Sequence, residues 1–136
     1  MIAMMNQVTT KSALFIDDNF YNRDLASLAL RHVGYQVSEA VDGVQALKIL
    51  ETERFDLIVL DLAMPEVDGN GVLHQLHDTG ITGYTYVIVM TANPHMATGE
   101  VEMIADYVMY KPIDVAEFAR FAQRMSVTKK GRNSPI

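Results

Sequence analysis

Polar side chains that can bind a metal or accept a phosphoryl group follow four separate apolar runs of this sequence. The acidic pair Asp17-Asp18 follows the first run, and Asp61, Thr91 and Lys111 follow three later ones. An aspartate at the end of a strand usually caps the next helix or lies in a solvated turn. That interpretation accounts for any one of these residues. It does not account for three carboxylates, a hydroxyl and an ammonium at matching positions.

Together these residue types indicate phosphoryl chemistry. Neighbouring carboxylates repel one another, and a hard divalent cation relieves the repulsion through oxygen ligands. Mg²⁺ typically takes one or two carboxylates, several waters and a phosphate oxygen. At such a site one carboxylate can attack phosphorus in line. Lys111 would add positive charge at the group in transfer, and the Thr91 hydroxyl would donate to the phosphoryl oxygens.

The elements that must position these residues alternate along the chain. Short apolar runs typical of buried strands occur at 13–16, 35–40, 57–60, 86–90 and 107–110, with amphipathic stretches between them. Five strands alternating with five helices predict an α/β fold with helices on both faces of a parallel sheet. We expect the flavodoxin-like (βα)5 doubly wound sheet with strand order 2-1-3-4-5, in which ligands bind outside the carboxyl ends of the strands.

Each helix is expected to bury one apolar face. The residues predicted on these faces are, in chain order, Leu25, Leu28, Ala29, His32 and Val33; Val44, Leu47 and Leu50; Val72, Leu73 and Leu76; Met96, Val101 and Ile104; and Val115, Phe118, Ala119 and Ala122. Asn19, Asp42 and Asp114 are predicted caps. The fourth helix should be short, because Pro94 and Gly99 are poor helix-interior residues.

Composition limits the class of protein. The chain has 136 residues, 49% of them apolar and 21% charged, which predicts a single globular domain. It has no cysteine, and its net charge of −6 argues against binding a nucleic-acid backbone. We find neither an apolar run of membrane-spanning length nor a signal-peptide pattern, so we expect a cytoplasmic protein. The predicted divisions are an N-terminal extension (1–11), one domain (12–125) and a flexible basic tail (126–136).

Taken in order, these motifs resemble the receiver domain of two-component response regulators over residues 12–125. The matching pieces are Asp17-Asp18, the run Asp61-Leu62-Ala63-Met64-Pro65-Glu66-Val67-Asp68-Gly69, Thr91-Ala92, Lys111-Pro112, and the connectors Gly34-Tyr35, Ala40, Asp42-Gly43 and Ala46-Leu47. Each piece alone is weakly specific, but the ordered set is highly specific.

The resemblance implies a role for each site residue. Asp61 would accept the phosphoryl group from a histidine kinase or a phosphotransfer protein. Asp18, Asp61 and the backbone carbonyl of Ala63 would bind Mg²⁺, with Asp17 acting mainly through water. Lys111 would pair with the acceptor, and Thr91 would move toward the phosphoryl oxygens.

The resemblance also implies how the protein works. It would catalyse only its own phosphorylation and dephosphorylation. It would signal to a downstream protein through the face formed by the fourth helix, fifth strand and fifth helix, without contacting nucleic acid or membrane directly.

The sequence departs from the family pattern in two places. Three positions before the lysine the family often has an aromatic residue that swings with the threonine, but this chain has Val108. Strand alternation places Tyr107 on the opposite face, so we do not expect the usual aromatic relay. The second departure is the stretch between Thr91 and Lys111, which is shorter than usual in the family, so we expect a fourth helix that is short, shifted or mobile. Ala63 and Asn93 occupy positions that in the family tune loss of the phosphoryl group. Because Ala63 offers no polar side chain to orient a water, we expect slow self-dephosphorylation.

Two other protein classes stay open. One is a pseudo-receiver, an interaction module that is never phosphorylated; the five site residues present here count against it. The other is a Mg²⁺-dependent phosphohydrolase, which would need an acid-base aspartate where this chain has Ala63, and a substrate-capping insertion. His74 and His77 share a predicted helix face, but no further ligand is evident, so we expect surface histidines. The chain could act alone, in a relay, or as part of a larger regulator.

Overall fold

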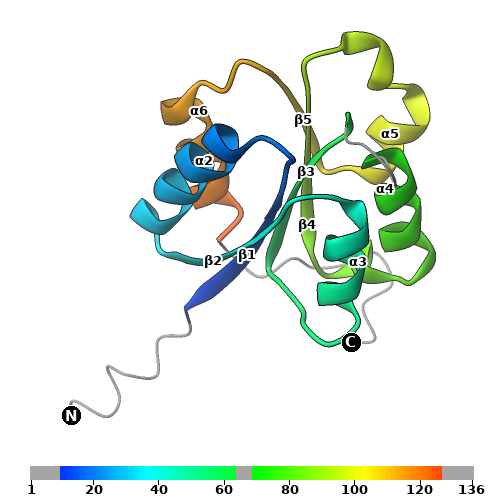
Figure 1. The fold of residues 1–136 in the computed structure, drawn as a ribbon, viewed down its shortest axis with the longest axis horizontal. Helices are drawn as coiled ribbons and strands as arrows, with labels where there is room; N and C mark the ends of the chain where they lie inside the picture. The colour runs from blue at the N-terminus through cyan, green and yellow to red at the C-terminus, as the bar shows by residue number, and fades with distance from the viewer. Residues whose placement is uncertain (1–9, 64–68, 127–136) are drawn as a thin grey trace.

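A five-stranded parallel sheet forms the centre of the molecule. In this computed structural model, residues 10–63 and 69–126 of the chain are described. The strands are β1 (Lys11–Ile16), β2 (Tyr35–Ala40), β3 (Leu57–Asp61), β4 (Tyr86–Thr91) and β5 (Tyr107–Tyr110). Their order in the sheet is β2-β1-β3-β4-β5, which confirms the predicted fold class and strand order (Figure 1).

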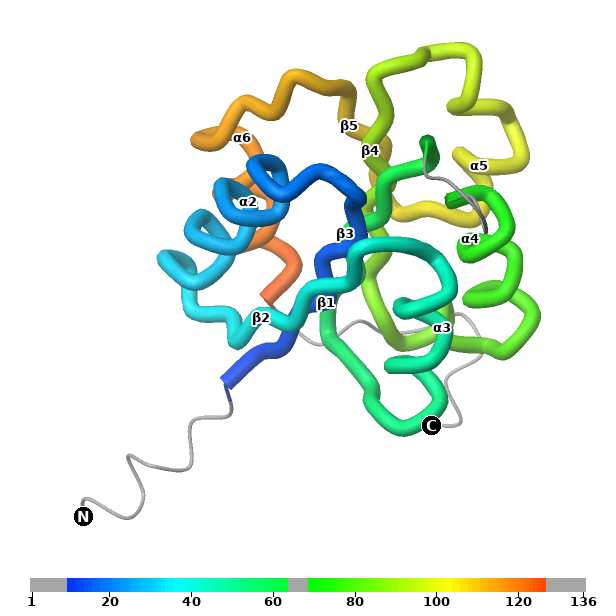
Figure 2. The backbone as a smooth tube through the Cα atoms, in the orientation of Figure 1, coloured from blue at the N-terminus to red at the C-terminus, as the bar shows by residue number. Residues whose placement is uncertain are grey.

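Helices cover both faces of this sheet. They are α2 (Phe20–His32), α3 (Gly43–Leu50), α4 (Gly69–Asp78), α5 (Gly99–Ile104) and α6 (Val115–Arg124), with short 3₁₀ turns η1 (Ile81–Gly83) and η2 (Pro94–Met96). α2 and α6 lie on one side of the sheet, and α3, α4 and α5 lie on the other (Figures 1 and 2). Each layer closes over its own apolar cluster, because alternate residues of each strand face opposite sides.

Three polar residues start helices close to the carboxyl ends of strands. Asn19, Asp42 and Asp114 each accept a hydrogen bond from the backbone N–H three residues later, at 3.0, 2.8 and 3.0 Å. These predicted caps are confirmed. They satisfy N–H groups that have no partner inside the helix, and they fix the point at which the chain turns away from the sheet edge.

The predicted helix faces are partly wrong. Five residues expected to be buried are exposed, namely Leu25 (43%), Leu28 (58%), His32, Val44 (50%) and Val115 (37%). On α2 the buried residues are Ala26, Ser27, Ala29 and Leu30, of which only Ala29 was predicted. The three apolar ones pack in the cluster shared with α6. Small alanine side chains let a helix approach its neighbour closely, and this contact decides which face of α2 is covered.

The segment between β4 and β5 confirms the prediction of a short helix. It contains the turn η2 and then α5, which is only 6 residues long and starts at the cap Thr98. Within the described ranges no helix is long and apolar enough to cross a membrane. The strand β1 starts two residues earlier than predicted, at Lys11. Residues 1–9 of the predicted N-terminal extension, and the predicted basic tail beyond Ser126, lie outside the described residues.

Candidate functional site

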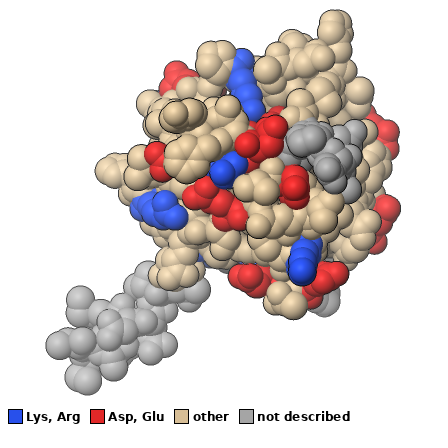
Figure 3. All heavy atoms as spheres, in the orientation of Figure 1, with Lys and Arg blue, Asp and Glu red and all other residues tan. Residues whose placement is uncertain are grey.

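Three carboxylates meet at the carboxyl edge of the sheet, as predicted. Asp17, Asp18 and Asp61 each place one oxygen atom so that these atoms all lie within 4.8 Å of one another. The parallel pairing of β1 with β3 brings them together, because Ile16 is opposite Leu60 in the register. Asp17 and Asp61 are buried, whereas Asp18 is exposed. Acidic and basic side chains are interspersed near the middle of the face shown in Figure 3.

Both carboxylate oxygens of Asp17 already accept hydrogen bonds. The backbone N–H of Asn19 donates to Oδ1 at 2.9 Å, and the Asn22 amide donates to Oδ2 at 3.4 Å. Lys111 Nζ also donates to Oδ2, at 2.8 Å. A carboxylate held by three donors keeps a fixed orientation, which suits a group that acts through water. Asp18 is exposed, so its carboxylate is accessible to a hydrated cation.

Asp61 lies between a backbone donor and a cation. Its Oδ1 accepts a hydrogen bond from the Ala63 N–H at 3.1 Å, and its Oδ2 pairs with Lys111 Nζ at 3.1 Å. Burial raises the pKa of the Asp61 carboxyl above its ordinary value, although the Ala63 N–H and Lys111 oppose the shift. Burial alone would lower the pKa of Lys111, but Asp17 and Asp61 raise it, so the ammonium stays charged at neutral pH.

Thr91 ends β4 at the same edge of the sheet. Its side chain is buried, and its hydroxyl donates to the carbonyl of Asn93 at 3.1 Å and accepts from the Asn93 N–H at 3.0 Å. The backbone carbonyl of Thr91 accepts a hydrogen bond from the Lys111 N–H at 2.9 Å. The structure therefore brings the predicted hydroxyl and ammonium to the edge that carries the carboxylates.

Gly69 supports the site in a way that the sequence analysis did not predict. A Cβ atom at this position would lie 2.2 Å from the backbone oxygen of Asp61 and 2.3 Å from the Cα of Leu62. The N–H of Gly69 donates to the Leu62 carbonyl at 3.0 Å. Only a residue without a side chain fits here. The sequence signal was the place of Gly69 at the end of the family-like run that starts at Asp61; residues 64–68 lie outside the described ranges.

Arg23 is a second residue that the sequence analysis missed. Its Nη1 donates to the backbone carbonyl of Asp17 at 2.8 Å, and its Nε pairs with Glu39 Oε1 at 3.2 Å. The arginine comes from the first turns of α2, six positions after Asp17. Nothing in the local sequence indicates that this side chain turns back toward the strand ends.

The donor set fits a hard divalent cation. Oxygen ligands on opposite sides of one Mg²⁺ or Ca²⁺ ion are about 4 to 5 Å apart, which matches the spacing of the three carboxylates. Among the described residues, no other group of three or more His, Cys, Asp or Glu is placed to hold a metal. His74 instead bonds the Asn70 carbonyl at 2.8 Å and the Glu100 carboxylate, and His77 is exposed. Both are surface histidines, as predicted.

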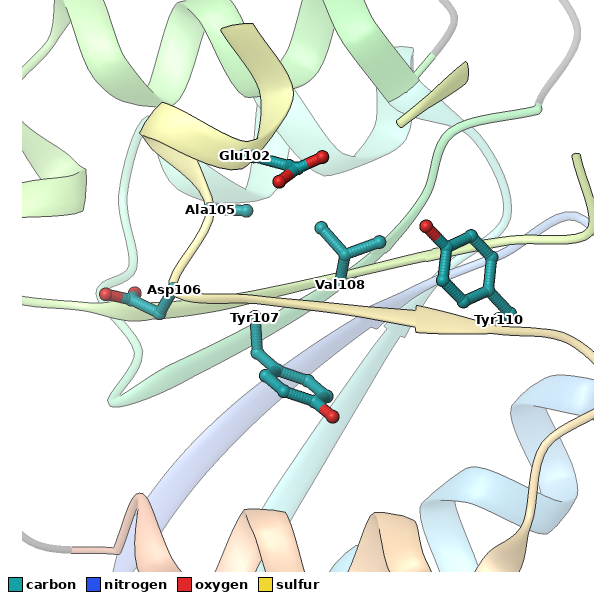
Figure 4. A pocket seen from close by; sticks show the side chains of 6 residues that line it. All are labelled: Glu102, Ala105, Asp106, Tyr107, Val108 and Tyr110. Carbon is teal, nitrogen blue, oxygen red and sulfur yellow. The ribbon is translucent and has the colours of Figure 1, made fainter. Parts of the chain in front are cut away.

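The edge strand β5 separates its side chains between the two faces of the sheet. Tyr107 stacks on Phe121 of α6 with ring centroids 4.1 Å apart, whereas Val108 packs in the opposite cluster. Beside this strand a cavity of about 320 Å³ is lined by Glu102, Ala105, Asp106, Tyr107, Val108 and Tyr110 (Figure 4). The expected placement of Tyr107 and Val108 on opposite faces of the sheet is confirmed. The Tyr107 ring therefore does not lie on the face where Val108 packs.

Comparison with known sequences identifies relatives of two lengths. The family model of the response regulator receiver domain matches residues 13–123. The chain is 36% identical over 105 residues to sporulation initiation phosphotransferase F of Bacillus subtilis, covering 76% of this chain and 74% of that protein. It is 34% identical over 114 residues to a probable transcriptional regulator, ycf27, of Cyanophora paradoxa, covering 82% of this chain and 46% of the relative. The chain thus spans about half the length of the ycf27 relatives that it matches.

Solved structures agree with the sequence relatives. The response regulator TrrA from Thermotoga maritima, in complex with Mg²⁺-BeF, aligns with a TM-score of 0.76 at 26% identity, covering 85% of this chain and 98% of that one. The chemotaxis protein CheY4 of Vibrio cholerae aligns with a TM-score of 0.76 at 25% identity, covering 86% of this chain and 99% of that one. The family match over most of the chain, the shared fold and the aspartate cluster lead to one conclusion. This chain belongs to the response regulator receiver domain family.

Proposed function

We propose that the protein is the phosphoacceptor of a two-component phosphorelay, phosphorylated on Asp61 with Mg²⁺ by a histidine kinase or a phosphotransfer protein. The observation that carries this proposal is the position of the Asp61 carboxylate, within 4.8 Å of two other carboxylates and 3.1 Å from the Lys111 ammonium. Receiver domains bind a divalent metal at such an aspartate cluster. They also interact with histidine kinases and phosphotransfer proteins.

Each side chain has a definable part in the reaction. An Asp61 oxygen forms a bond to phosphorus while the bond to the donor nitrogen breaks, and the electron pair leaves with the donor imidazole. Mg²⁺, held by Asp18, Asp61 and the carbonyl of Ala63, would neutralise charge on the phosphoryl oxygens. Lys111 adds a second positive charge 3.1 Å from the acceptor. In this proposal the protein catalyses only its own phosphorylation and dephosphorylation.

Two findings support the details. The TrrA structure was solved in complex with Mg²⁺-BeF, and the same fold here carries a carboxylate cluster that fits a hard cation. The name of the B. subtilis relative describes a phosphotransferase, which favours a role in passing phosphoryl groups between proteins. We extend the proposal to a cytoplasmic protein that signals to a protein target through the face formed by α5, β5 and α6, without direct contact with nucleic acid or membrane.

Acetyl phosphate tests the proposal directly. Incubation of the wild type with Mg²⁺ and acetyl phosphate should add one phosphoryl group, detected by intact mass, and EDTA or Asp61→Asn should abolish the adduct. Asp24→Asn, which changes an exposed aspartate on α2, is the matched control and should label as the wild type does. Absence of any adduct on the wild type would identify a pseudo-receiver. Phosphate release without an adduct would instead identify a phosphohydrolase.

A further inference from the structure

We propose that Arg23 is a positioning residue for the metal site, holding the backbone that joins Asp17 to Asp18. This inference rests on the proposed function, because it concerns the affinity of that site for Mg²⁺. Arg23 itself does not reach the reacting atoms. It acts through the main chain of the acidic pair, and its contribution can be separated from a general effect on folding.

Arg23 is held on two sides. Its side chain is only 12% exposed, its Nη1 donates to the Asp17 carbonyl at 2.8 Å, and its Nε pairs with Glu39 at 3.2 Å. The guanidinium carbon also lies 5.8 Å from the centroid of the Phe20 ring. The planar guanidinium presents donors in a fixed geometry, so it can serve both acceptors at once, which the single ammonium of a lysine does less well.

The contact with Asp17 fixes the direction of the next side chain. The carbonyl that accepts from Arg23 belongs to the peptide plane joining Asp17 to Asp18. On the other side of the same residue, the Asp17 N–H donates to the carbonyl of Ala40, at the end of β2, at 3.1 Å. Both backbone groups of Asp17 are thus hydrogen-bonded. They fix the direction in which the Asp18 side chain extends from the main chain before any cation binds.

Because Arg23 is positively charged, a positioning role and a purely electrostatic role predict opposite changes in Mg²⁺ affinity when it is removed. A cation close to a metal site opposes the binding of a second cation, so simple electrostatics predicts that removing Arg23 strengthens Mg²⁺ binding. Glu39 lies against the guanidinium and offsets part of this charge. A positioning role predicts the opposite result, since partners that orient metal ligands typically contribute about 10- to 100-fold to metal affinity.

Calorimetric titration of the metal-free protein with MgCl2 shows whether loss of Arg23 weakens or strengthens Mg²⁺ binding. Arg23→Ala should weaken Mg²⁺ binding by about 10-fold or more, and Arg23→Lys, which keeps the charge, should weaken it by a smaller factor. Arg31→Ala removes the same charge from an exposed position at the far end of α2 and should change the affinity less than twofold, by the screening of distant charges. In the metal-free state, the Asn19 amide that bonds Asp17 should exchange faster in Arg23→Ala.

Equal or tighter Mg²⁺ binding by Arg23→Ala would overturn the inference. If that variant does not fold, Arg23→Lys decides, and an affinity equal to that of the wild type overturns it. Failure of the proposed function would look different. It would appear as a wild type that forms no Mg²⁺-dependent adduct on Asp61, whereas failure of this inference would leave that adduct and the affinity of Arg23→Ala intact.

Discussion

Gly69 provides a severe test of the site, because a single methyl group should displace the backbone of Asp61. In Gly69→Ala the new Cβ would lie 2.2 Å from the Asp61 backbone oxygen and 2.3 Å from the Leu62 Cα. Ordinary contacts between such atoms are about 3.5 Å, so the two chain segments must separate by roughly 1 Å. The neighbouring atoms belong to the main chain and cannot rotate away as a side chain can.

The cost follows from two contributions. Overpacking of a tightly packed site costs about 1 to 3 kcal/mol. The hydrogen bond from the Gly69 N–H to the Leu62 carbonyl, 3.0 Å long, would also lengthen or break, and its loss adds about 1 kcal/mol. We therefore expect Gly69→Ala to lower the free energy of unfolding by about 2 to 4 kcal/mol. Because the displaced carbonyl belongs to Asp61, labelling by acetyl phosphate should fall as well.

Urea denaturation followed by circular dichroism, in EDTA, measures the effect. Gly99→Ala is the matched control, since a Cβ at Gly99 meets no atom within 4 Å and the residue starts α5. That variant should be as stable as the wild type or more stable by about 0.4 to 1 kcal/mol, because alanine reduces the freedom of the unfolded chain. A Gly69→Ala protein within about 0.5 kcal/mol of the wild type would refute the close approach, since ordinary surface substitutions stay within that range.

Two further predictions concern the charge and turnover of the site, and a third concerns the surface pair of His74 and Glu100. In EDTA at neutral pH, Asp61→Asn should raise the urea midpoint of unfolding. Burial raises the pKa of the Asp61 carboxyl, so the ionised form costs stability above that pKa. Mg²⁺ should reduce the difference between the two proteins, and a lower midpoint for the variant in EDTA would contradict the reasoning. The hydrogen bond with Glu100 raises the pKa of His74, so this contact stabilises the fold below pH 6.5 and its contribution fades as pH rises through the folded-state pKa. His74→Gln should therefore lose more stability in acidic than in alkaline buffer, measured against His77→Gln, and an equal loss in both would exclude the pair as the cause. Ala63→Asn should shorten the lifetime of the phosphoryl group, followed by intact mass after removal of acetyl phosphate, because the amide can orient an attacking water; an unchanged lifetime would show that position 63 does not limit hydrolysis.

Sequence patterns predicted the sheet better than the helix faces. A strand covered on both sides must be apolar throughout, so the runs at 57–60 and 86–90 could be recognised without any knowledge of their neighbours. The buried side of α2 depends on how closely that helix approaches α6. The leucines at 25 and 28 are more hydrophobic than the alanines at 26 and 29, yet the alanines are buried because they allow the close contact. A hydrophobicity scale ranks leucine above alanine and takes no account of how closely two helices can approach.

The same distinction applies to the site. Asp17, Asp61 and Lys111 could be placed together because parallel strands bring their carboxyl ends to one edge. The contributions of Gly69 and Arg23 could not be predicted. Each depends on how closely the residue approaches main-chain atoms of another segment, and the sequence does not give that distance. A glycine in a loop usually indicates a turn, and an arginine on a helix usually indicates a solvated surface. Only the folded arrangement shows that one admits no side chain and the other reaches back to the Asp17 carbonyl.

The hydroxyl of Thr91 has a single proton, and in this structure the carbonyl of Asn93 receives it. The hydroxyl can donate to a phosphoryl oxygen on Asp61 only if it stops donating to the Asn93 carbonyl. A rotation of the whole Thr91 side chain would also take the acceptor away from the Asn93 N–H. The Asn93 N–H then needs a new acceptor, whereas the Asn93 carbonyl keeps its hydrogen bond from the Met96 N–H, at 3.0 Å. Donation to a phosphoryl oxygen and retention of the contact with Asn93 thus compete for one hydroxyl proton.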